Sequence, residues 1–356
     1  MRAAVVQGSS IVVRDDVPEP KPGPGQVLAR TIACGICGSD LHALEFPDQI
    51  ARLMRGAGTS CELGSGIEYV MGHEFVAEVI DHGPETAGVV PAGGLVCSVP
   101  VLAGAAGIDP IGYSRTAPGG YGELIVLQES IMVPVPEGVE PRLAALTEPL
   151  AVGEHAVAVA DVQPGWPCHV VGCGPIGLAI ILALKARGVS PIVASDFSAR
   201  RRELAQRLGA DLVLDPSDGP GFPDFAQFGV PGNALERTAT ASGGAAAPRA
   251  VLFEAVGVPG VIGSITEAAP PGSRVVVVGV CMQPDRFEPT LALVKELELR
   301  FAFAYTPTEF ASTLQRIASA PELVTPLITS TVPIDGVADA FAALRAGEQV
   351  KVLVEH

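Results

Sequence analysis

Short apolar runs broken by turns fill the first part of the chain. β-Branched and aromatic residues concentrate in runs of the length that strands have, and clusters of Pro and Gly, as at residues 18–25, separate them. The predicted strands are residues 2–7, 11–14, 26–33, 70–80, 94–99 and 123–128. Many short strands at this spacing indicate a compact, barrel-like β domain.

The pattern changes near residue 149, where helical stretches begin to alternate with apolar strands. Residues 175–187 and 199–208 have helical periodicity, and a further helical stretch lies between the last two strands. The strands of this part are residues 168–172, 191–195, 211–214, 250–255 and 273–279. This alternation predicts a parallel sheet of βαβ units. Residues 219–247, rich in Gly, Pro and Ala, are expected to form a loop with a short helix.

Length and charge narrow the possible functions. The 356 residues suffice for two domains. The net charge of -16, from 39 acidic and 23 basic residues, would repel phosphate backbones and anionic lipid, so nucleic acid and membrane are not expected partners. Arg14, Asp15 and Asp16 interrupt the apolar start, the apolar stretch at residues 170–184 is too short to span a bilayer, and seven cysteines form no disulfide framework. We expect a cytoplasmic protein.

Two short segments carry a candidate metal site. Cys37 in one, and His73 with Glu74 in the other, offer a thiolate, an imidazole and a carboxylate to one zinc ion. Structural zinc sites usually close with four Cys and His ligands, whereas catalytic sites keep a position open for water or substrate. The Cys34–Cys37 pair has no second CxxC to complete a four-sulfur site. We therefore interpret Cys37 as a ligand and Cys34 as a small buried residue, followed by a glycine-rich turn.

A glycine-rich turn marks a candidate dinucleotide site. Gly172, Gly174 and Gly177 follow an apolar strand and open a helix, where they allow a tight turn, close approach of a pyrophosphate, and close packing of helix on strand. The next strand ends at Asp196, a suitable place for a carboxylate that binds the adenosine ribose. The alternative, a glycine-rich turn of an unrelated sheet, does not account for the matched acid.

The same region bears on the choice of cofactor. The Asp196 carboxylate favours NAD, because it would repel the additional phosphate of NADP. Against this, one of the three arginines at residues 200–202 could pair with that phosphate. The triplet is also what a solvated first turn of a helix would contain. We expect NAD, with NADP less favoured.

The motifs together resemble those of the zinc-containing medium-chain alcohol dehydrogenases, in the branch that includes sorbitol and related polyol dehydrogenases. The resemblance rests on residues 34–42, 72–74, 119–123, 147–150, 172–196 and 270–280, and so extends almost from end to end. It implies an α/β protein with a GroES-like, β-rich catalytic domain at residues 1–149, completed by residues 304–356. Residues 150–303 would form a Rossmann domain, with the active site between the two.

The resemblance also implies roles for individual residues. Cys37 and His73 would bind zinc with a third ligand from Glu74 or Glu148, a choice that the sequence leaves open. Zinc would lower the pKa of a bound alcohol so that the alkoxide can expel hydride to the nicotinamide ring. Ser39 would take the proton and His42 would pass it to solvent. The implied cofactor-binding residues are Gly172, Gly174, Pro175, Ile176, Gly177, Asp196, Arg201, Val256, Val278 and Val280.

The chain departs from the family in two respects. Residues 100–119 contain no cysteine where many relatives carry a structural zinc, so we expect one catalytic zinc per chain and no structural zinc. The loop between His42 and His73 is long, and its residues 50–55, which could form a short helix, lie where a substrate would be selected.

The contacts to a polyol are incomplete as well. Ala43 replaces an aromatic residue after His42, and of an Arg-Tyr pair expected on a later strand only Tyr305 remains, in the stretch 303–305. Fewer hydrogen-bonding side chains suit a less hydroxylated alcohol. A secondary, cyclic or aromatic alcohol is therefore as consistent with the sequence as a sugar alcohol.

The sequence thus predicts a zinc-dependent oxidoreductase that moves a hydride between a secondary alcohol or polyol, or the corresponding ketone, and NAD. A zinc-independent quinone or enoyl reductase of the same fold is the nearest alternative, but it would not need the zinc ligands. A dinucleotide-binding protein without catalysis is another, and an intact relay argues against it. The family also implies a homodimer or homotetramer, with strands pairing across Rossmann domains near residues 286–289.

Overall fold

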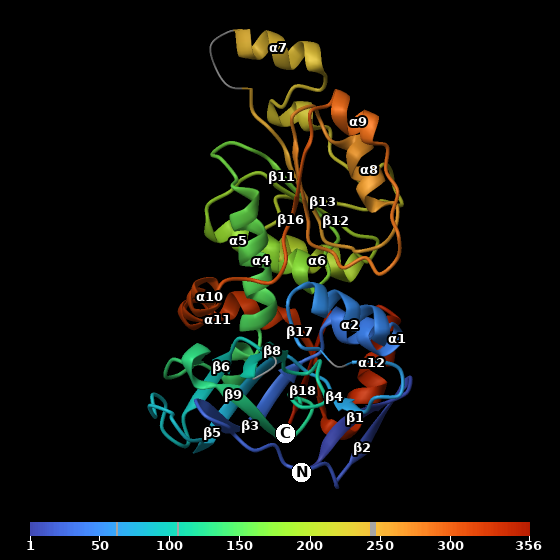
Figure 1. Ribbon diagram of the computed structural model, residues 1–356. Helices are drawn as coiled ribbons and strands as arrows, with labels where there is room; N and C mark the ends of the chain where they lie inside the picture. Colours follow the sequence, from blue (N-terminus) through green and yellow to red (C-terminus); the bar gives the residue numbers. More distant parts are fainter. Residues whose placement is uncertain (62, 105–106, 243–246) are drawn as a thin grey trace. The chain divides into compact units, whose positions relative to one another are not determined.

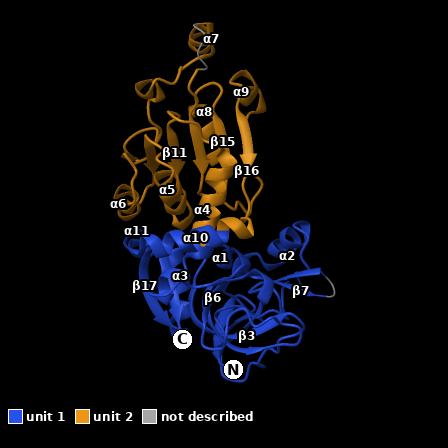
Figure 2. Cartoon of the chain, turned by 90° about the vertical axis from the view of Figure 1, so that its left-hand side faces the viewer, with its two compact units in different colours: residues 1–148, 310–356 blue, residues 149–309 orange. Residues whose placement is uncertain are grey.

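The protein divides into two compact units, shown in different colours in Figure 2. The computed structural model describes residues 1–61, 63–104, 107–242 and 247–356. Unit 1 comprises Met1–Glu148 and Phe310–His356, and unit 2 comprises Pro149–Glu309. The chain thus returns to unit 1 at Phe310, whereas the sequence placed this boundary at residue 304. Phe310 lies within helix α10 (Pro307–Ser319).

Unit 1 is built on a mixed sheet of seven strands in the order β10-β6-β5-β3-β18-β17, with β9 paired to β3. A smaller sheet has the order β2-β1-β4, and β7 forms a hairpin with β8. The bounds are β1 Ala3–Gln7, β2 Ser10–Arg14, β3 Gln26–Gly35, β4 Tyr69–Val70, β5 Glu74–His82, β6 Leu95–Ser98, β7 Val101–Gly104, β8 Gly107–Pro110, β9 Leu124–Gln128, β10 Met132–Pro134, β17 Ile328–Pro333 and β18 Lys351–Glu355. The last strand of the chain, β18, pairs with β3, so the C-terminal segment completes a sheet begun in the first part of the chain.

The strand expected at residues 70–80 is interrupted, and the interruption places a candidate ligand. β4 ends at Val70 and β5 begins at Glu74, with Gly72 between them at a φ of 104°. The backbone there bonds sideways instead, since the amide of Gly120 donates to Gly72 O at 2.7 Å and that of Tyr121 donates to Met71 O at 2.9 Å. This left-handed turn needs a glycine and leaves His73 buried at the start of β5.

A helix, rather than the expected glycine-rich turn, follows Cys37. Helix α1 runs over Gly38–Glu45, and the Cys37 amide at its N-terminus donates to Asp40 Oδ2 at 2.9 Å. This contact satisfies one of the amides that every helix start leaves unpaired. The other helices of this unit are α2 Pro47–Gly56, α3 Pro141–Ala144, α11 Pro321–Val324 and α12 Val337–Arg345, while α4 Thr147–Ala160 and α10 extend into unit 2. Residues 50–55 lie within α2.

Unit 2 contains a six-stranded parallel sheet in the order β13-β12-β11-β14-β15-β16, with helices packed around it (Figure 1). Its strands are β11 Cys168–Val171, β12 Ile192–Ser195, β13 Leu212–Leu214, β14 Val251–Glu254, β15 Arg274–Val277 and β16 Glu298–Phe301. Its helices are α5 Pro175–Ala186, α6 Ala199–Arg207, α7 Ala234–Ser242, α8 Val261–Ala268 and α9 Pro289–Val294. Every residue of β12, β14 and β15 is buried, as is usual for a parallel sheet covered on both faces.

Two details of unit 2 differ from expectation. The stretch expected as a loop with one short helix contains the 3₁₀ turn Phe225–Phe228 as well as α7, and its residues 243–246 lie outside the described residues. Residues 303–305 are not on a strand, because β16 ends at Phe301 and Ala304 has a φ of 56°. Tyr305 therefore belongs to the segment between β16 and α10.

One segment of the described chain, Pro141–Ala160, is long and apolar enough to cross a membrane by length and composition alone. Inside the protein, 72% of it is buried, which is how the core helix of a globular protein also behaves. Its apolar composition is therefore accounted for by packing within the fold.

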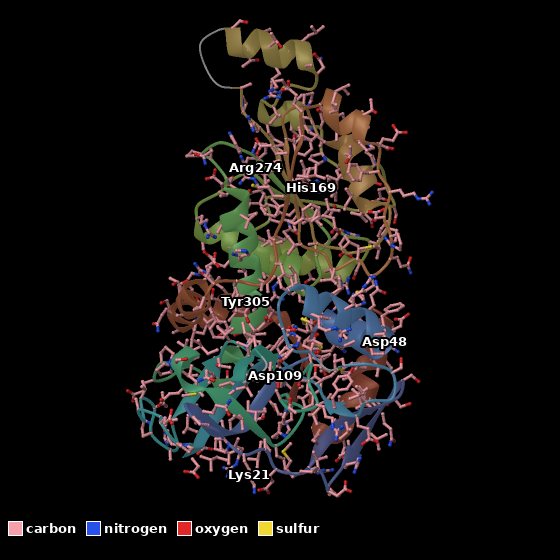
Figure 3. All side chains as sticks on the ribbon, in the orientation of Figure 1. Lys21, Asp48, Asp109, His169, Arg274 and Tyr305 are labelled. Atoms are coloured by element: carbon pink, nitrogen blue, oxygen red, sulfur yellow. The ribbon has the colours of Figure 1, made fainter. Side chains whose placement is uncertain are left out.

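His169 is a fully buried histidine in the sheet of unit 2 (Figure 3). Its Nε2 lies 3.0 Å from Ser195 Oγ, which ties β11 to β12, and its ring stands edge-on to Phe222 with the centroids 5.3 Å apart. Burial disfavours the imidazolium ion and lowers the pKa of His169 to about 3. The folded protein therefore holds this side chain neutral.

We predict that His169 makes the protein less stable in mild acid. Below an unfolded-state pKa of about 6.5 the unfolded chain binds a proton that the folded protein refuses, which costs about 2 kcal/mol between pH 7 and pH 5. Urea unfolding followed through Trp166, the single tryptophan, measures this, because Trp166 lies in unit 2. His169→Gln should lose this part of the pH dependence. An equal loss of stability in the wild type and the variant would contradict the prediction.

Candidate active site

Cys37, His73 and Glu74 come together in unit 1. Each offers one ligand atom, and these atoms lie within 4.8 Å of one another. Cys37 stands at the start of α1, whereas His73 and Glu74 stand at the start of β5, which pairs with β3 so that Glu74 faces Gly35. A thiolate, an imidazole and a carboxylate at this separation are donors that zinc accepts, and the residues present therefore fit a zinc ion.

Asp40 is a carboxylate, with no exposed surface, that lies behind His73. His73 Nδ1 is 3.3 Å from Asp40 Oδ1, which leaves the other ring nitrogen for a metal. Burial alone would lower the pKa of His73, but the charges of Asp40 and Cys37 and hydrogen bonding to them together outweigh it and raise that pKa well above its usual value. A proton and a metal ion would thus compete for this imidazole.

Two buried tyrosines bond to the same carboxylate. Tyr121 donates to Asp40 Oδ2 at 2.7 Å, and the hydroxyl of Tyr113 lies 3.1 Å from Asp40 Oδ1 and 2.7 Å from Ser39 Oγ. Burial, reinforced by the charge of Asp40, raises the pKa of both phenols well above the usual value. Both tyrosines are therefore neutral donors at physiological pH.

Glu74 is held by a buried lysine from the end of the chain. Lys351 Nζ lies 2.8 Å from Glu74 Oε1, 2.7 Å from Glu74 Oε2 and 3.0 Å from Ile36 O, so all three of its protons are engaged. Both side chains are almost completely shielded from solvent. Burial alone would lower the pKa of Lys351, but Glu74, together with the charges of Cys37 and Glu148, outweighs the effect of burial and raises that pKa. The Glu74 carboxylate is thus compensated by the positive charge of Lys351.

The second candidate carboxylate, Glu148, lies in the first turn of α4. Its charge contributes to the raised pKa of Lys351, which puts it near the same cluster, but it is not one of the three residues whose ligand atoms meet. His155, further along α4, pairs with Glu309 at 3.0 Å. That contact is a packing contact within unit 2.

Ser39 and His42 both lie on α1, three residues apart, a spacing that puts them on the same face of the helix. Ser39 is half-buried and bonded to Tyr113. Partial burial lowers the pKa of His42, so that the neutral imidazole prevails near pH 7.

The glycine-rich turn of unit 2 lies between β11 and α5. Gly172 has a φ of 93°, and a Cβ at Gly177 would overlap the carbonyl oxygen of Gly172, so neither position tolerates another residue. Gly174 stands at the N-terminus of α5, where a Cβ would meet no protein atom within 4 Å. Packing within the described protein therefore does not require a glycine at position 174.

Asp196, which directly follows β12, connects the glycine-rich turn to the loop after β12. Its Oδ2 accepts from the Cys173 amide and its Oδ1 from the Ser198 amide, each at 2.8 Å. Arg201 Nη1 lies 3.8 Å from Asp196 Oδ2. Arg202 instead pairs with Asp215 at 2.7 Å.

The remaining candidate cofactor residues lie at the same edge of the sheet. Val256 and Val280 are 43% and 42% exposed, an unusual exposure for valine, and Val278 donates its amide to Glu254 O at 2.9 Å. A Cβ on Gly172 would touch Val256, so the first and fourth strands of the unit present these residues together. The buried carboxylate of Glu254 fixes the loop by accepting from the amides of Val256 and Gly257, each at 2.8 Å.

Sequence reasoning missed four side chains that organise the metal position, namely Asp40, Tyr113, Tyr121 and Lys351. Asp40 offered a signal, because an acidic residue three positions after Cys37 is what a helix N-terminus often contains. The two tyrosines and Lys351 offered none, since their partners lie 73 to 277 residues away in the chain.

Comparison with known proteins identifies the family. Residues 23–137 match the alcohol dehydrogenase GroES-like domain, and residues 175–319 match the zinc-binding dehydrogenase family. The chain is 31% identical over 366 residues to (R,R)-butanediol dehydrogenase of Bacillus subtilis, covering 99% of both proteins. It is 27% identical to human sorbitol dehydrogenase, covering 99% of this chain and 94% of that protein.

Solved structures agree. The crystal structure of 2R,3R-butanediol dehydrogenase from Bacillus subtilis matches with a TM-score of 0.75 at 27% identity, over 100% of this chain and 99% of that one. A zinc-binding dehydrogenase of Sinorhizobium meliloti, solved bound to NADP, matches with a TM-score of 0.78 at 24% identity, over 100% and 99% of the two chains. The chain belongs to the zinc-containing medium-chain alcohol dehydrogenases, polyol dehydrogenase-like, and is an oxidoreductase with a GroES-like and a Rossmann-like domain.

Proposed function

We propose that the protein is a zinc-dependent dehydrogenase that transfers a hydride between a secondary alcohol or polyol and NAD. The observation that carries this proposal is the approach of Cys37, His73 and Glu74, whose ligand atoms lie within 4.8 Å of one another. A zinc-independent quinone or enoyl reductase of the same fold has no use for these three side chains at this separation. Zinc analysis separates the two functions.

Cys37, His73 and Glu74 would hold the ion, and zinc, when bound, supplies the Lewis acid that lowers the pKa of an alcohol. We favour Glu74 over Glu148 as the third ligand, because Glu74 already belongs to the group whose atoms meet. Lys351 would keep Glu74 oriented by its two contacts of 2.7 and 2.8 Å. Glu148 would then act at longer range.

Ser39 would accept the proton of the alcohol, and His42 would pass it towards solvent. Both are presented by α1, which Cys37 begins, so the ligand and the relay belong to one rigid element. The lowered pKa of His42 suits this role, because the neutral imidazole can accept a proton near pH 7.

The cofactor would bind along the carboxyl edge of the unit 2 sheet, where ligands of such folds bind. The open space at Gly174 supports close approach of the pyrophosphate to the N-terminus of α5. Asp196 would receive the adenosine ribose, which favours NAD. Arg201, 3.8 Å from Asp196, is the arginine best placed to tolerate the phosphate of NADP, because Arg202 is engaged by Asp215.

We infer the class of substrate from helix α1 and from the substrates for which two relatives are named. Two relatives are named for butanediol and sorbitol. The side chain of Ala43 is buried and has no polar atom, so we favour a vicinal diol or secondary alcohol with few hydroxyl groups over a sugar alcohol.

We predict one zinc per chain, held by the three named ligands. Cys37→Ala and His73→Ala should lose both zinc and turnover, whereas Ser39→Ala should keep zinc and lose turnover by a factor of about 10² or more. Elemental analysis of the purified protein and initial rates measure these outcomes. Cys168→Ala removes a buried thiol of unit 2 and should keep zinc and rate. Two zinc ions per chain, or an active zinc-free Cys37→Ala, would contradict the proposal.

We predict that NAD supports faster oxidation than NADP. Asp196→Ala should lower the preference by about tenfold or more, because a carboxylate that repels the phosphate is removed, and Arg201→Ala should raise it. Reduced-nicotinamide absorbance with 2,3-butanediol, sorbitol, cyclohexanol and benzyl alcohol measures both the cofactor and the substrate preference. Faster turnover with NADP in the wild type would overturn the assignment, and no turnover with any alcohol would leave the reductase alternative.

We further propose that the chain forms a homodimer or homotetramer through unit 2. β16 is an edge strand, and Leu293, Phe301 and Phe303 beside it are 73%, 71% and 69% exposed, which is costly for an isolated chain. Light scattering of the purified protein should give two or four times the 36.4 kDa chain mass. A monomer at micromolar concentration would contradict this, and Phe301→Asp should shift the protein towards monomer.

A further inference from the structure

Tyr113 lies beside the proposed proton relay, although no part of the sequence motifs points to it. It belongs to the region of residues 100–119, which lacks the cysteines that many relatives use there for a structural zinc. Its hydroxyl lies 2.7 Å from Ser39 Oγ, the shortest contact that Ser39 makes among the hydrogen bonds described here. Its side chain is only 3% exposed, so the position of the hydroxyl is set by packing.

The phenol has one proton and two acceptors within reach. Asp40 Oδ1 is the farther, at 3.1 Å, while Ser39 Oγ is at 2.7 Å. The other carboxylate oxygen, Oδ2, accepts from the Cys37 amide and from Tyr121, and His73 Nδ1 faces Oδ1 at 3.3 Å as a charge partner. Because the contact with Ser39 is the shorter of the two, we assign the proton of Tyr113 mainly to Ser39.

This contact decides what the serine hydroxyl has left to offer. A hydroxyl carries one proton and two lone pairs. When Tyr113 donates to one lone pair, Ser39 keeps one lone pair to accept a proton and one proton to donate onward. A relay residue needs this combination, because it must accept from the alcohol and donate to the next group in the same step.

We propose that Tyr113 is a positioning residue of the relay, which fixes Ser39 Oγ so that it accepts a proton on one side and donates its own on the other. The inference rests on the proposed function, since it requires Ser39 to carry the proton. Tyr113 itself gains and loses no proton in this scheme. Its ring also packs against the proposed metal ligand His73, with the centroids 5.1 Å apart, so a variant must keep the ring.

Tyr113→Phe is the test, because it removes only the hydroxyl. With NAD and 2,3-butanediol, or with the alcohol of the panel above that turns over fastest, we expect kcat to fall about tenfold while the KM for NAD is unchanged. The solvent deuterium isotope effect on kcat should rise, because proton transfer becomes slower than the other steps. A merely structural role would not move the isotope effect.

Two other tyrosines supply controls. Tyr69 is also buried, and its hydroxyl donates to the Ala43 carbonyl at 3.3 Å, so Tyr69→Phe removes a buried hydroxyl without touching the relay and should leave kcat within about twofold. Tyr121→Phe removes the donor to Asp40 Oδ2, together with a longer contact of 3.3 Å to Gly35 O, but no contact to Ser39, so its effect reports on the support of Asp40 without the contact to Ser39. An equal rise of the isotope effect in Tyr121→Phe would assign the role to Asp40 and overturn the proposal.

Coupling and structure complete the test. If Tyr113 acts through Ser39, adding Tyr113→Phe to Ser39→Ala should reduce kcat no further. If the two residues act independently, the two reductions in kcat should multiply. A crystal structure of Tyr113→Phe should show Ser39 Oγ in more than one rotamer with the zinc ligands unmoved, and this result does not depend on activity. A single unchanged rotamer together with an unchanged kcat would overturn the proposal. An unimpaired Ser39→Ala would instead refute the relay in the proposed function.

Discussion

The geometry of the site depends on one buried carboxylate. Asp40 has no exposed surface; its Oδ2 accepts hydrogen bonds from the Cys37 amide and the Tyr121 hydroxyl, and its Oδ1 faces the Tyr113 hydroxyl at 3.1 Å and His73 at 3.3 Å. A buried charge is tolerated only when its oxygens are so satisfied. Each of these partners is thereby fixed relative to the others, and the start of α1 is fixed relative to the start of β5. The two segments that carry the proposed ligands are held together before any metal arrives.

A second buried charge, that of Lys351, holds the proposed ligand Glu74. Lys351 and Glu74 are separated by 277 residues, yet they form a fully shielded pair in which β18 meets the sheet of the first half of the chain. Removing either partner would leave an uncompensated charge in the core. The last strand is therefore required for the carboxylate to be available near the metal position, which gives a physical reason for the chain to return to unit 1 after completing unit 2.

Patterns of neighbouring residues predicted those helices and strands whose formation depends mainly on neighbouring residues. The helix predicted at residues 175–187 is α5, Pro175–Ala186, and the parallel strands of unit 2 lie where apolar runs occur, because a strand buried on both faces must be apolar throughout. The metal site was predictable only as a set of residue types. The charged residues that support the site were not predictable. In the sequence, Lys351 looks like an exposed lysine near a terminus, and only the fold places it beside Glu74. The break between β4 and β5 was also missed, since the amides that satisfy Met71 and Gly72 come from residues 120 and 121.

Hydrogen bonds, rather than cysteines, order the described part of residues 100–119. Without cysteines this region cannot hold a metal through four sulfurs, and its described part is ordered instead by the β7–β8 hairpin and by contacts such as Thr116 with Asp109 at 2.6 Å. This ordered segment places the Tyr113 hydroxyl beside Ser39 Oγ. In the proposed relay, which is sensitive to small displacements of the Ser39 hydroxyl, the packing of this region would affect proton transfer through the position of Tyr113. Substitutions in the hairpin should therefore affect turnover through Tyr113, even though no residue of the hairpin itself touches the proposed ligands among the contacts described.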